Sequence, residues 1–170
     1  MIKIPRTNWD VFFMLHAHLA ATRSTCDRGP ELFFDPDRHG VGCVIVRDKR
    51  IIAGGYNGSP PGEPHCDNVG HLMVDGHCVR TIHSERNALL QCALDGISPV
   101  DADLYTTASP CFDCTKDIIR AEIKRVIVGQ DYESRYGLSS GTKEKLEEAG
   151  VEVDYLLLTQ ESFPYRSSTF

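Results

Sequence analysis

Two short segments, His83-Ser84-Glu85 and Pro110-Cys111-Phe112-Asp113-Cys114, constrain this chain more than any other part of its sequence. Together they supply one histidine and two cysteines, which are typical zinc ligands. Structural zinc is normally held by four protein ligands, whereas catalytic zinc keeps one position for water. Glu85 follows the histidine by two residues, where its carboxylate can act on that water without binding the metal. The pattern therefore predicts an open, catalytic zinc site with His83, Cys111 and Cys114 as ligands.

Both segments are expected to begin helices. Pro110 suits the first turn of a helix, and Cys111 and Cys114 are three residues apart, so their side chains share a helix face. Residues 86–94 likewise carry apolar side chains at helical spacing. A helix N-terminus carries partial positive charge, which favours the thiolate that binds metal. We therefore expect two helix N-termini to converge on one zinc ion.

Two other interpretations of the cysteine pair are open at this point. A Cys-x-x-Cys in a reducing compartment is also typical of a redox pair, but that function would leave the upstream His-x-Glu unexplained. A purely structural zinc site would need a fourth ligand, which His77 or Cys78 could supply. Neither alternative gives Glu85 a function.

Length, charge and cysteine count restrict the classes of protein to which this chain can belong. The chain has 170 residues, of which 41% are hydrophobic and 25% charged, with a formal net charge of -6 and a pI of about 5.6. We predict one domain over residues 1–158 and a C-terminal tail over 159–170. The acidic balance argues against a broad nucleic-acid surface, and we expect no membrane span and no signal peptide. Seven cysteines, two of them committed as ligands, favour a reduced, cytoplasmic protein.

Strand and helix patterns alternate along the chain. The first helix is predicted from Trp9 to Thr22, with Asn8 as its N-cap. Its apolar stripe is expected to pack on a sheet through Trp9, Phe12, Phe13, His16 and Leu19. Residues 41–46 and 51–56 then read as the two strands of a hairpin.

The second half of the chain adds three strands and a helix. Strands are predicted at 102–107, 125–129 and 151–158, and a charged helix at 141–149 that ends at Gly150. Together with the helices at the two motifs, this order predicts an α/β fold with three layers. Its sheet would be mixed and five-stranded, would begin with an antiparallel hairpin, and would carry helices on both faces.

Two connections lack periodicity and are predicted to be irregular, one over residues 24–40 and one over 57–82. Long structureless connections are uncommon unless they are functional or held in place. The second connection contains His65-Cys66, His71 and His77-Cys78, so a metal ion could hold it.

With these residues placed, the chain resembles the cytidine deaminase superfamily, whose signature is His-x-Glu followed by Pro-Cys-x-x-Cys. More narrowly, it resembles deoxycytidylate (dCMP) deaminases. That likeness depends on Gly55-Tyr56-Asn57-Gly58-Ser59-Pro60, on His65-Cys66-Asp67 and on residues 121–126, within a resemblance that runs from Trp9 to Leu158. It implies a cytidine deaminase-like fold with one catalytic Zn²⁺ per chain.

The resemblance also implies which residues bind substrate. Asn57 would bond the deoxyribose hydroxyl, and Tyr132 matches a tyrosine that stacks on the pyrimidine. Ser24 and Arg38 match the loop that holds the 5′-phosphate, and Arg28 is a further candidate because guanidinium suits phosphate. A solvated surface charge is the alternative for any one of these arginines.

Regulation is implied in the same way. Proteins of this kind resemble one another in being homohexamers that dCTP activates and dTTP inhibits, each nucleotide with Mg²⁺, at a site away from the zinc. The residues that resemble part of that site are Gly55, Tyr56, Gly58, Ser59, Pro60 and His65. A glycine-rich turn lets a nucleotide approach the backbone closely. The alternative is that these glycines only end a strand.

Some relatives carry a second zinc ion, bound in part by cysteines that match Cys26 and Cys66. Here Cys26, Cys66, His71 and Cys78 are candidates for such a site. The chain departs from the family pattern at Ser84, where alanine is usual, and in a loop over residues 26–38 that is longer than usual.

The resemblance therefore predicts hydrolytic deamination of dCMP to dUMP and ammonia, with Glu85 moving protons between the water, ring nitrogen 3 and the leaving amine. A deaminase of another base, such as tRNA adenosine or a free nucleoside, shares the zinc motif, although the acidic composition counts against RNA. A non-catalytic zinc-stabilised module is the rival of another class, and Glu85 counts against it.

Overall fold

A mixed five-stranded sheet forms the centre of the protein, whose computed structural model describes residues 6–132, 140–159 and 162. The strands lie in the order β4-β3-β7-β8-β9. Their bounds are β3 Gly42–Arg47, β4 Arg50–Tyr56, β7 Asp103–Ala108, β8 Arg125–Gln130 and β9 Glu152–Tyr155. β3 pairs antiparallel with β4 and β7, whereas β7 with β8 and β8 with β9 are parallel. The predicted mixed sheet that begins with a hairpin is confirmed.

The connections explain these strand directions. Asp48 and Lys49 join β3 to β4 with φ of 52° and 59°, the left-handed backbone that two-residue hairpin turns need to match the twist of their strands. Parallel neighbours instead need a crossover, normally a helix. Helix α4 (Phe112–Arg120) lies between β7 and β8 in the chain, and α5 (Ser140–Glu148) between β8 and β9.

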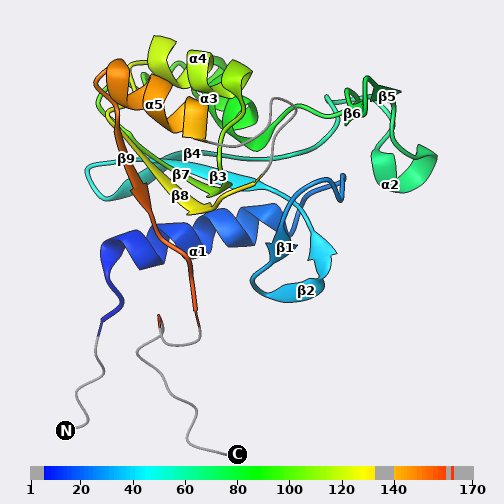
Figure 1. Ribbon diagram of the computed structural model, residues 1–170, viewed down its shortest axis with the longest axis horizontal. Helices are drawn as coiled ribbons and strands as arrows, with labels where there is room; N and C mark the ends of the chain where they lie inside the picture. Colours follow the sequence, from blue (N-terminus) through cyan, green and yellow to red (C-terminus); the bar gives the residue numbers. More distant parts are fainter. Residues whose placement is uncertain (1–5, 133–139, 160–161, 163–170) are drawn as a thin grey trace, which may run out of the picture.

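Helices cover both faces of the sheet, as predicted (Figure 1). α1 (Trp9–Ala21) lies on one face, and α3 (Ser84–Asp95), α4 and α5 lie on the other. Alternation along β3 serves both layers, because successive strand side chains point to opposite faces. Cys43 and Ile45 belong to the apolar cluster under α3 to α5, and Val44 and Val46 to the cluster under α1.

The buried face of α1 differs from the predicted stripe. Asn8 caps the helix as expected, accepting a hydrogen bond from the Asp10 N–H at 2.7 Å. Of the stripe, Phe13 is buried, whereas Trp9, Phe12 and Leu19 are exposed. The buried face instead comprises Phe13, Met14, Ala17, His18 and Ala21.

The two connections expected to be irregular carry short regular elements, so that expectation was wrong. The first contains a small hairpin of β1 (Glu31–Leu32) and β2 (Asp35–His39). The second contains α2 (Cys66–Val69) and a hairpin of β5 (Met73–Val74) and β6 (His77–Cys78). Neither hairpin joins the central sheet.

Within the described part of the chain, no helix combines the length and the apolar character needed to cross a membrane. Of the predicted tail over residues 159–170, only Thr159 and Ser162 are described. The rest of the tail lies outside the described residues, so the boundary of the domain stays a prediction.

Candidate active site and second metal-ligand cluster

The three predicted zinc ligands meet where two helices begin. His83 is the N-cap of α3 and Cys111 the N-cap of α4, and both have an extended backbone. Pro110 therefore precedes the helix, and it does not occupy the first turn as predicted. His83 Nδ1 lies 3.4 Å from Cys111 Sγ and 3.6 Å from Cys114 Sγ. Two ligands of one tetrahedral zinc ion lie ~3.6 Å apart, so the donor atoms fit this metal.

The charges at this cluster also suit a cation. Hydrogen bonds from the Cys114 thiol, and then from His83, lower the pKa of Cys111 to about 4 against the effect of burial. The pKa of Cys114 is raised, because its thiol donates a hydrogen bond to Cys111 and because it is buried. The contact with Cys111 raises the pKa of His83 to about 9. Cys111 is therefore a thiolate paired with the His83 imidazolium, and a bound metal ion would take the place of that proton.

Glu85 lies in the first turn of α3 and is only 3% exposed. Burial raises the pKa of its carboxyl group, partly opposed by His83. The Ser84 hydroxyl donates to Glu85 Oε2 at 2.9 Å, a contact that the sequence analysis missed, because it treated Ser84 only as a small replacement for alanine. A buried carboxyl group with a raised pKa is suited to exchange protons near neutral pH.

Among the described residues, the group of mutually close His, Cys, Asp and Glu donors at this site has three members, and Glu85 is not one of them. Cys78, considered as a fourth ligand, belongs to a different cluster, and His77 belongs to neither. The arrangement therefore leaves the open coordination position that catalytic zinc requires.

The ligands and Glu85 line a cavity of about 540 Å³. Of the predicted substrate-binding residues, Asn57, Tyr132 and Arg28 also line it. Ser109, which the sequence analysis did not single out, joins them and exchanges hydrogen bonds with the Tyr132 backbone at 2.9 and 3.2 Å. A cavity of this size can enclose a small molecule.

Asn57 is buried and held on three sides. Its Oδ1 accepts from the Ser24 hydroxyl at 2.6 Å and the Val41 N–H at 2.7 Å. Its Nδ2 donates to the carbonyl of Cys26 at 2.9 Å. Because an amide nitrogen has two hydrogens, one N–H is engaged in this bond and the other can serve a ligand.

The two remaining phosphate candidates lie elsewhere. Ser24 is buried against Asn57 and does not line the cavity, and Arg38 is an exposed residue of β2 outside it. Arg28 does line the cavity, and it donates to the Gly76 carbonyl at 3.1 Å. The phosphate assignments stay predictions, and of the three only Arg28 lines the cavity together with the zinc ligands.

The predicted effector residues lie at the end of β4 and just after it, and they have structural contacts of their own. Gly55 faces α3 so closely that a Cβ would lie 2.6 Å from the Ala88 nitrogen. Gly58 pairs with Ile82 through two backbone hydrogen bonds of 3.2 and 2.9 Å. Ser59 donates to the Pro64 carbonyl, and His65 is the N-cap of α2. Tyr56 and Pro60 are partly buried in the same segment.

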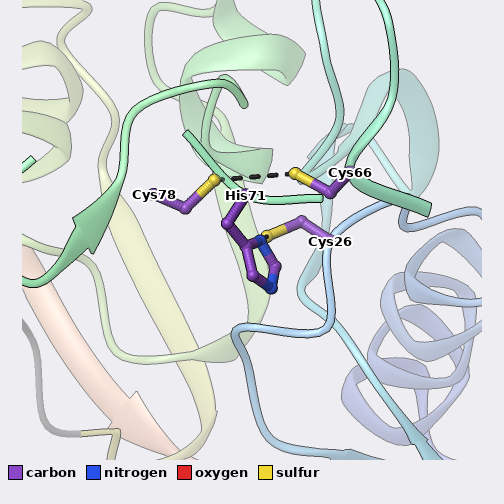
Figure 2. Close-up of side chains that lie close together, drawn as sticks. All are labelled: Cys26, Cys66, His71 and Cys78. Carbon is purple, nitrogen blue, oxygen red and sulfur yellow. Dashed lines mark hydrogen bonds between the residues drawn. The ribbon is translucent and has the colours of Figure 1, made fainter. Parts of the chain in front are cut away.

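The second candidate metal cluster contains four ligands, Cys26, Cys66, His71 and Cys78, whose donor atoms all lie within 4.8 Å of one another. Figure 2 shows the four side chains converging from separate segments. Cys26 Sγ is 3.7 Å from His71 Nδ1, and Cys66 Sγ is 3.5 Å from Cys78 Sγ. Both distances match two ligands of one tetrahedral ion, and four protein ligands make a closed, structural type of site.

A carboxylate completes this second cluster. His71 Nε2 lies 2.9 Å from Asp27 Oδ1. Histidines that bind metal through one ring nitrogen commonly donate the other N–H to a carboxylate, which fixes the tautomer and the ring orientation. The four candidate ligands were predictable from the sequence, but Asp27 was not, because its position depends on the fold of the first connection.

An α/β sheet that holds an open Cys₂His cluster beside a buried carboxylate defines a zinc-dependent deaminase. The family model "Cytidine and deoxycytidylate deaminase zinc-binding region" matches residues 7–130. The chain belongs to this family.

Three relatives make the likeness more specific. ComE operon protein 2 of Bacillus subtilis is 45% identical over 91% of this chain and 75% of its own length. The deoxycytidylate deaminase of Saccharomyces cerevisiae is 35% identical over 95% of this chain, which spans only 49% of that protein. A crystal structure of the dCMP deaminase of cyanophage S-TIM5 with dCMP and dUMP is 30% identical, with a TM-score of 0.69, over 85% of this chain and 94% of that one.

Proposed function

We propose that this protein is a dCMP deaminase, which hydrolyses dCMP to dUMP and ammonia. The observation that carries the proposal is the open three-ligand cluster with buried Glu85 at the base of a cavity. The family membership and the relatives described as deoxycytidylate deaminases support the same substrate.

His83, Cys111 and Cys114 would hold Zn²⁺. The ion supplies a Lewis acid that can lower the pKa of a bound water to about 7. Glu85 accepts a proton from the water that adds at carbon 4 of the pyrimidine, and delivers it to ring nitrogen 3. It then carries a proton to the departing amine, so that ammonia leaves. Burial serves this role, since it keeps the carboxyl group ready to hold a proton between the two steps.

The cavity residues would orient the nucleotide. Asn57 offers its remaining N–H to the deoxyribose hydroxyl, and Tyr132 stacks on the pyrimidine. Arg28 binds the 5′-phosphate, and Ser24 and Arg38 are retained as weaker phosphate candidates because neither lines the cavity. Ser109 fixes the Tyr132 backbone beside the base.

We propose further that dCTP activates and dTTP inhibits the enzyme, each with Mg²⁺, and that the enzyme is a homohexamer. The segment from Gly55 to Pro60 with His65 would contribute to the effector site. Support comes from the backbone bridge between Gly58 and Ile82, because Ile82 directly precedes the ligand His83. An effector that moves this turn would act directly on the zinc site.

The Cys26, Cys66, His71 and Cys78 cluster is proposed to hold a second, structural Zn²⁺. All seven cysteines of the chain are free, and the five that belong to the two proposed sites must be reduced to bind metal. We therefore place the protein in the cytoplasm.

Ammonia release is the direct test, with dCMP, CMP, dCTP, deoxycytidine and a tRNA stem-loop as competing substrates. Glu85→Gln should retain zinc and lose about 10²- to 10⁴-fold in kcat. Glu148→Gln, which makes the same change at an exposed position on α5, is the matched control. Turnover of Glu85→Gln within a few-fold of the control, or a preference for the stem-loop over dCMP, would refute the proposal.

A further inference from the structure

One wall of the catalytic cavity is a hairpin that has little to hold it in place. His77 and Cys78 of β6 and the following Val79 line the cavity. Strands β5 and β6 are only two residues each, and an isolated two-stranded hairpin is marginal in water. Its apolar residues bury little surface, since Met73 is 45% exposed and Val74 47% exposed. The β5–β6 hairpin must therefore be held in place by contacts with other segments of the chain.

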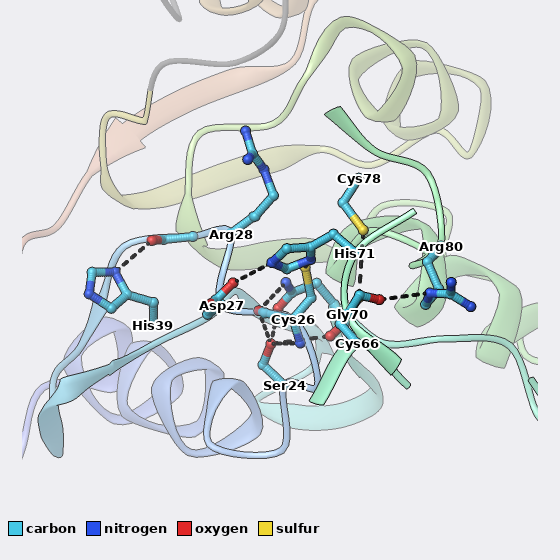
Figure 3. A network of polar contacts seen from close by, with 12 residues as sticks. Ser24, Cys26, Asp27, Arg28, His39, Cys66, Gly70, His71, Cys78 and Arg80 are labelled. Atoms are coloured by element: carbon cyan, nitrogen blue, oxygen red, sulfur yellow. Dashed lines mark hydrogen bonds and ion pairs between the residues drawn. The ribbon is translucent and has the colours of Figure 1, made fainter. Parts of the chain in front are cut away.

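Three consecutive residues of the first connection hold the hairpin, and Figure 3 shows two of them, Cys26 and Asp27, beside His71. Cys26 lies in the four-ligand cluster with His71 and Cys78. Asp27 contacts His71 at 2.9 Å, and Arg28 donates to the carbonyl of Gly76, in the turn of the hairpin, at 3.1 Å. Of these ties, a metal bound by the cluster would be the strongest, because it joins the two segments through four ligands at once.

The backbone carbonyl of Cys26 also contacts Asn57, which lines the cavity. This carbonyl accepts a hydrogen bond from Asn57 Nδ2 at 2.9 Å and lies 2.7 Å from the oxygen of the Ser24 hydroxyl. That hydroxyl donates its hydrogen to Asn57 Oδ1. Cys26 therefore connects the metal cluster, through its sulfur, to the orientation of the Asn57 amide, through its carbonyl.

We propose that the metal centre of Cys26, Cys66, His71 and Cys78 is a positioning centre for the substrate. With its metal bound, the centre holds the β5–β6 hairpin as a wall of the cavity and fixes the Asn57 amide. Without the metal, the hairpin loosens and Asn57 loses its orientation, while the zinc ligands and Glu85 on α3 and α4 keep theirs. The inference rests on the proposed function and on metal in this cluster, and it predicts weaker substrate binding with a nearly unchanged chemical step.

Cys66→Ser is the sharpest test, because Cys66 is a ligand that does not line the cavity. Metal analysis should find two zinc ions per wild-type chain and one in the variant. The KM for dCMP should rise about tenfold, equal to 1.4 kcal/mol and to about one hydrogen bond, with kcat within threefold of wild type. Cys92→Ser, the same change at a buried cysteine of α3 outside both clusters, should keep two zinc ions and the wild-type KM.

Two readouts do not depend on turnover. Hydrogen exchange of residues 71–78 should speed up in Cys66→Ser, and the Kd for dCMP, measured in the Glu85→Gln background, should rise by the same factor as KM. Asp27→Ala provides a variant that leaves all four ligands in place. Loss of such a carboxylate typically weakens metal binding about 10- to 100-fold, so its KM should fall towards the wild-type value as free zinc is raised.

The outcomes separate the proposals. A Cys66→Ser protein with one zinc and an unchanged KM would overturn the positioning role and leave the metal centre intact. A single zinc in the wild type, or a Cys66–Cys78 disulfide, would overturn the metal centre itself. A wild-type enzyme with two zinc ions that releases no ammonia from dCMP would refute the proposed function instead. If Cys66→Ser does not fold, a zinc-independent KM in Asp27→Ala overturns the inference.

Discussion

Replacing Gly55 with alanine should displace the catalytic helix. Gly55 lies in β4 against the first turns of α3, where a Cβ would approach the Ser84 carbonyl and lie 2.6 Å from the Ala88 nitrogen. These are backbone atoms, which cannot rotate away as a side chain can. Ordinary contact begins at 3.4 Å, so α3 must retreat by about 0.8 Å to clear the Ala88 nitrogen and by more to clear the Ser84 carbonyl.

A shift of α3 would displace residues of the candidate active site. His83 caps α3 and Glu85 lies in its first turn, so both would move with the helix relative to Cys111 and Cys114. A misplacement of ~1 Å in catalytic groups can cost ~10²-fold in rate. Overpacking of a core typically costs ~1–3 kcal/mol of stability. We therefore expect Gly55→Ala to lose about 100-fold in kcat/KM for dCMP while the protein still folds.

Gly54 provides the matched control one residue away in the same strand. Its added Cβ would meet the Cys43 carbonyl at 3.6 Å and Val44 Cγ1 at 3.8 Å, both ordinary contacts. Steady-state ammonia release, urea denaturation and zinc content should be measured for both variants. If Gly55→Ala stays within threefold of Gly54→Ala in kcat/KM and within 0.5 kcal/mol in stability, then the close approach of β4 to α3 does not position the site.

Two further predictions concern regulation and acid stability. Adding dTTP with Mg²⁺ should suppress dCMP turnover, and dCTP should relieve this inhibition. If neither nucleotide changes turnover, the segment from Gly55 to Pro60 does not bind an effector. Burial lowers the pKa of His18 to about 4 from the usual 6.5, so below pH 6.5 the unfolded chain takes up a proton that the folded protein resists. The contribution of His18 to the free energy of unfolding should thus be fully present above pH 6.5 and fall by about 2 kcal/mol on going to pH 5. Urea titrations should show a smaller fall for His18→Gln than for wild type, and equal falls would contradict the reasoning.

The sequence was sufficient for the central sheet and the three-ligand cluster because both depend on local patterns. Strand alternation and helix periodicity are properties of short windows. Cys111 and Cys114 need only one helix turn to share a face, and His83 with Glu85 needs only another. The remaining step was to bring two helix N-termini together, which the alternation of strands and helices already implies.

The buried face of α1 could not be predicted from hydrophobicity alone. A Cβ on Gly42 would collide with the backbone of Ala17 and Ala21, so the helix lies on β3 through small residues at close range. Ala17 and Ala21 are buried at that close approach, whereas Trp9 and Phe12 are exposed. The distance at which α1 approaches β3 depends on the residues of both elements. This distance therefore determines which face of α1 is buried.

The short hairpins were missed for a related reason. The side chains of β5 are exposed and those of β6 are only partly buried. Neither strand has an alternating apolar pattern, so their sequence carries no strand signal. Their positions depend on contacts with residues 26–28, more than forty positions earlier in the chain. The sequence pattern of a short segment cannot predict a structure that depends on contacts with a distant part of the chain.

The two metal-ligand clusters use the same residue types, and their neighbours distinguish them. At the four-ligand cluster, the nearby carboxylate is Asp27, which contacts the ring of a ligand and so acts on its orientation. At the three-ligand cluster, Glu85 lies outside the group of close donors but inside the cavity. A carboxylate that contacts a metal ligand can only orient that ligand. A carboxylate beside the open coordination position can instead transfer protons. Since Cys26 and Cys78 also line that cavity, the closed cluster shapes the space in which the open one would work.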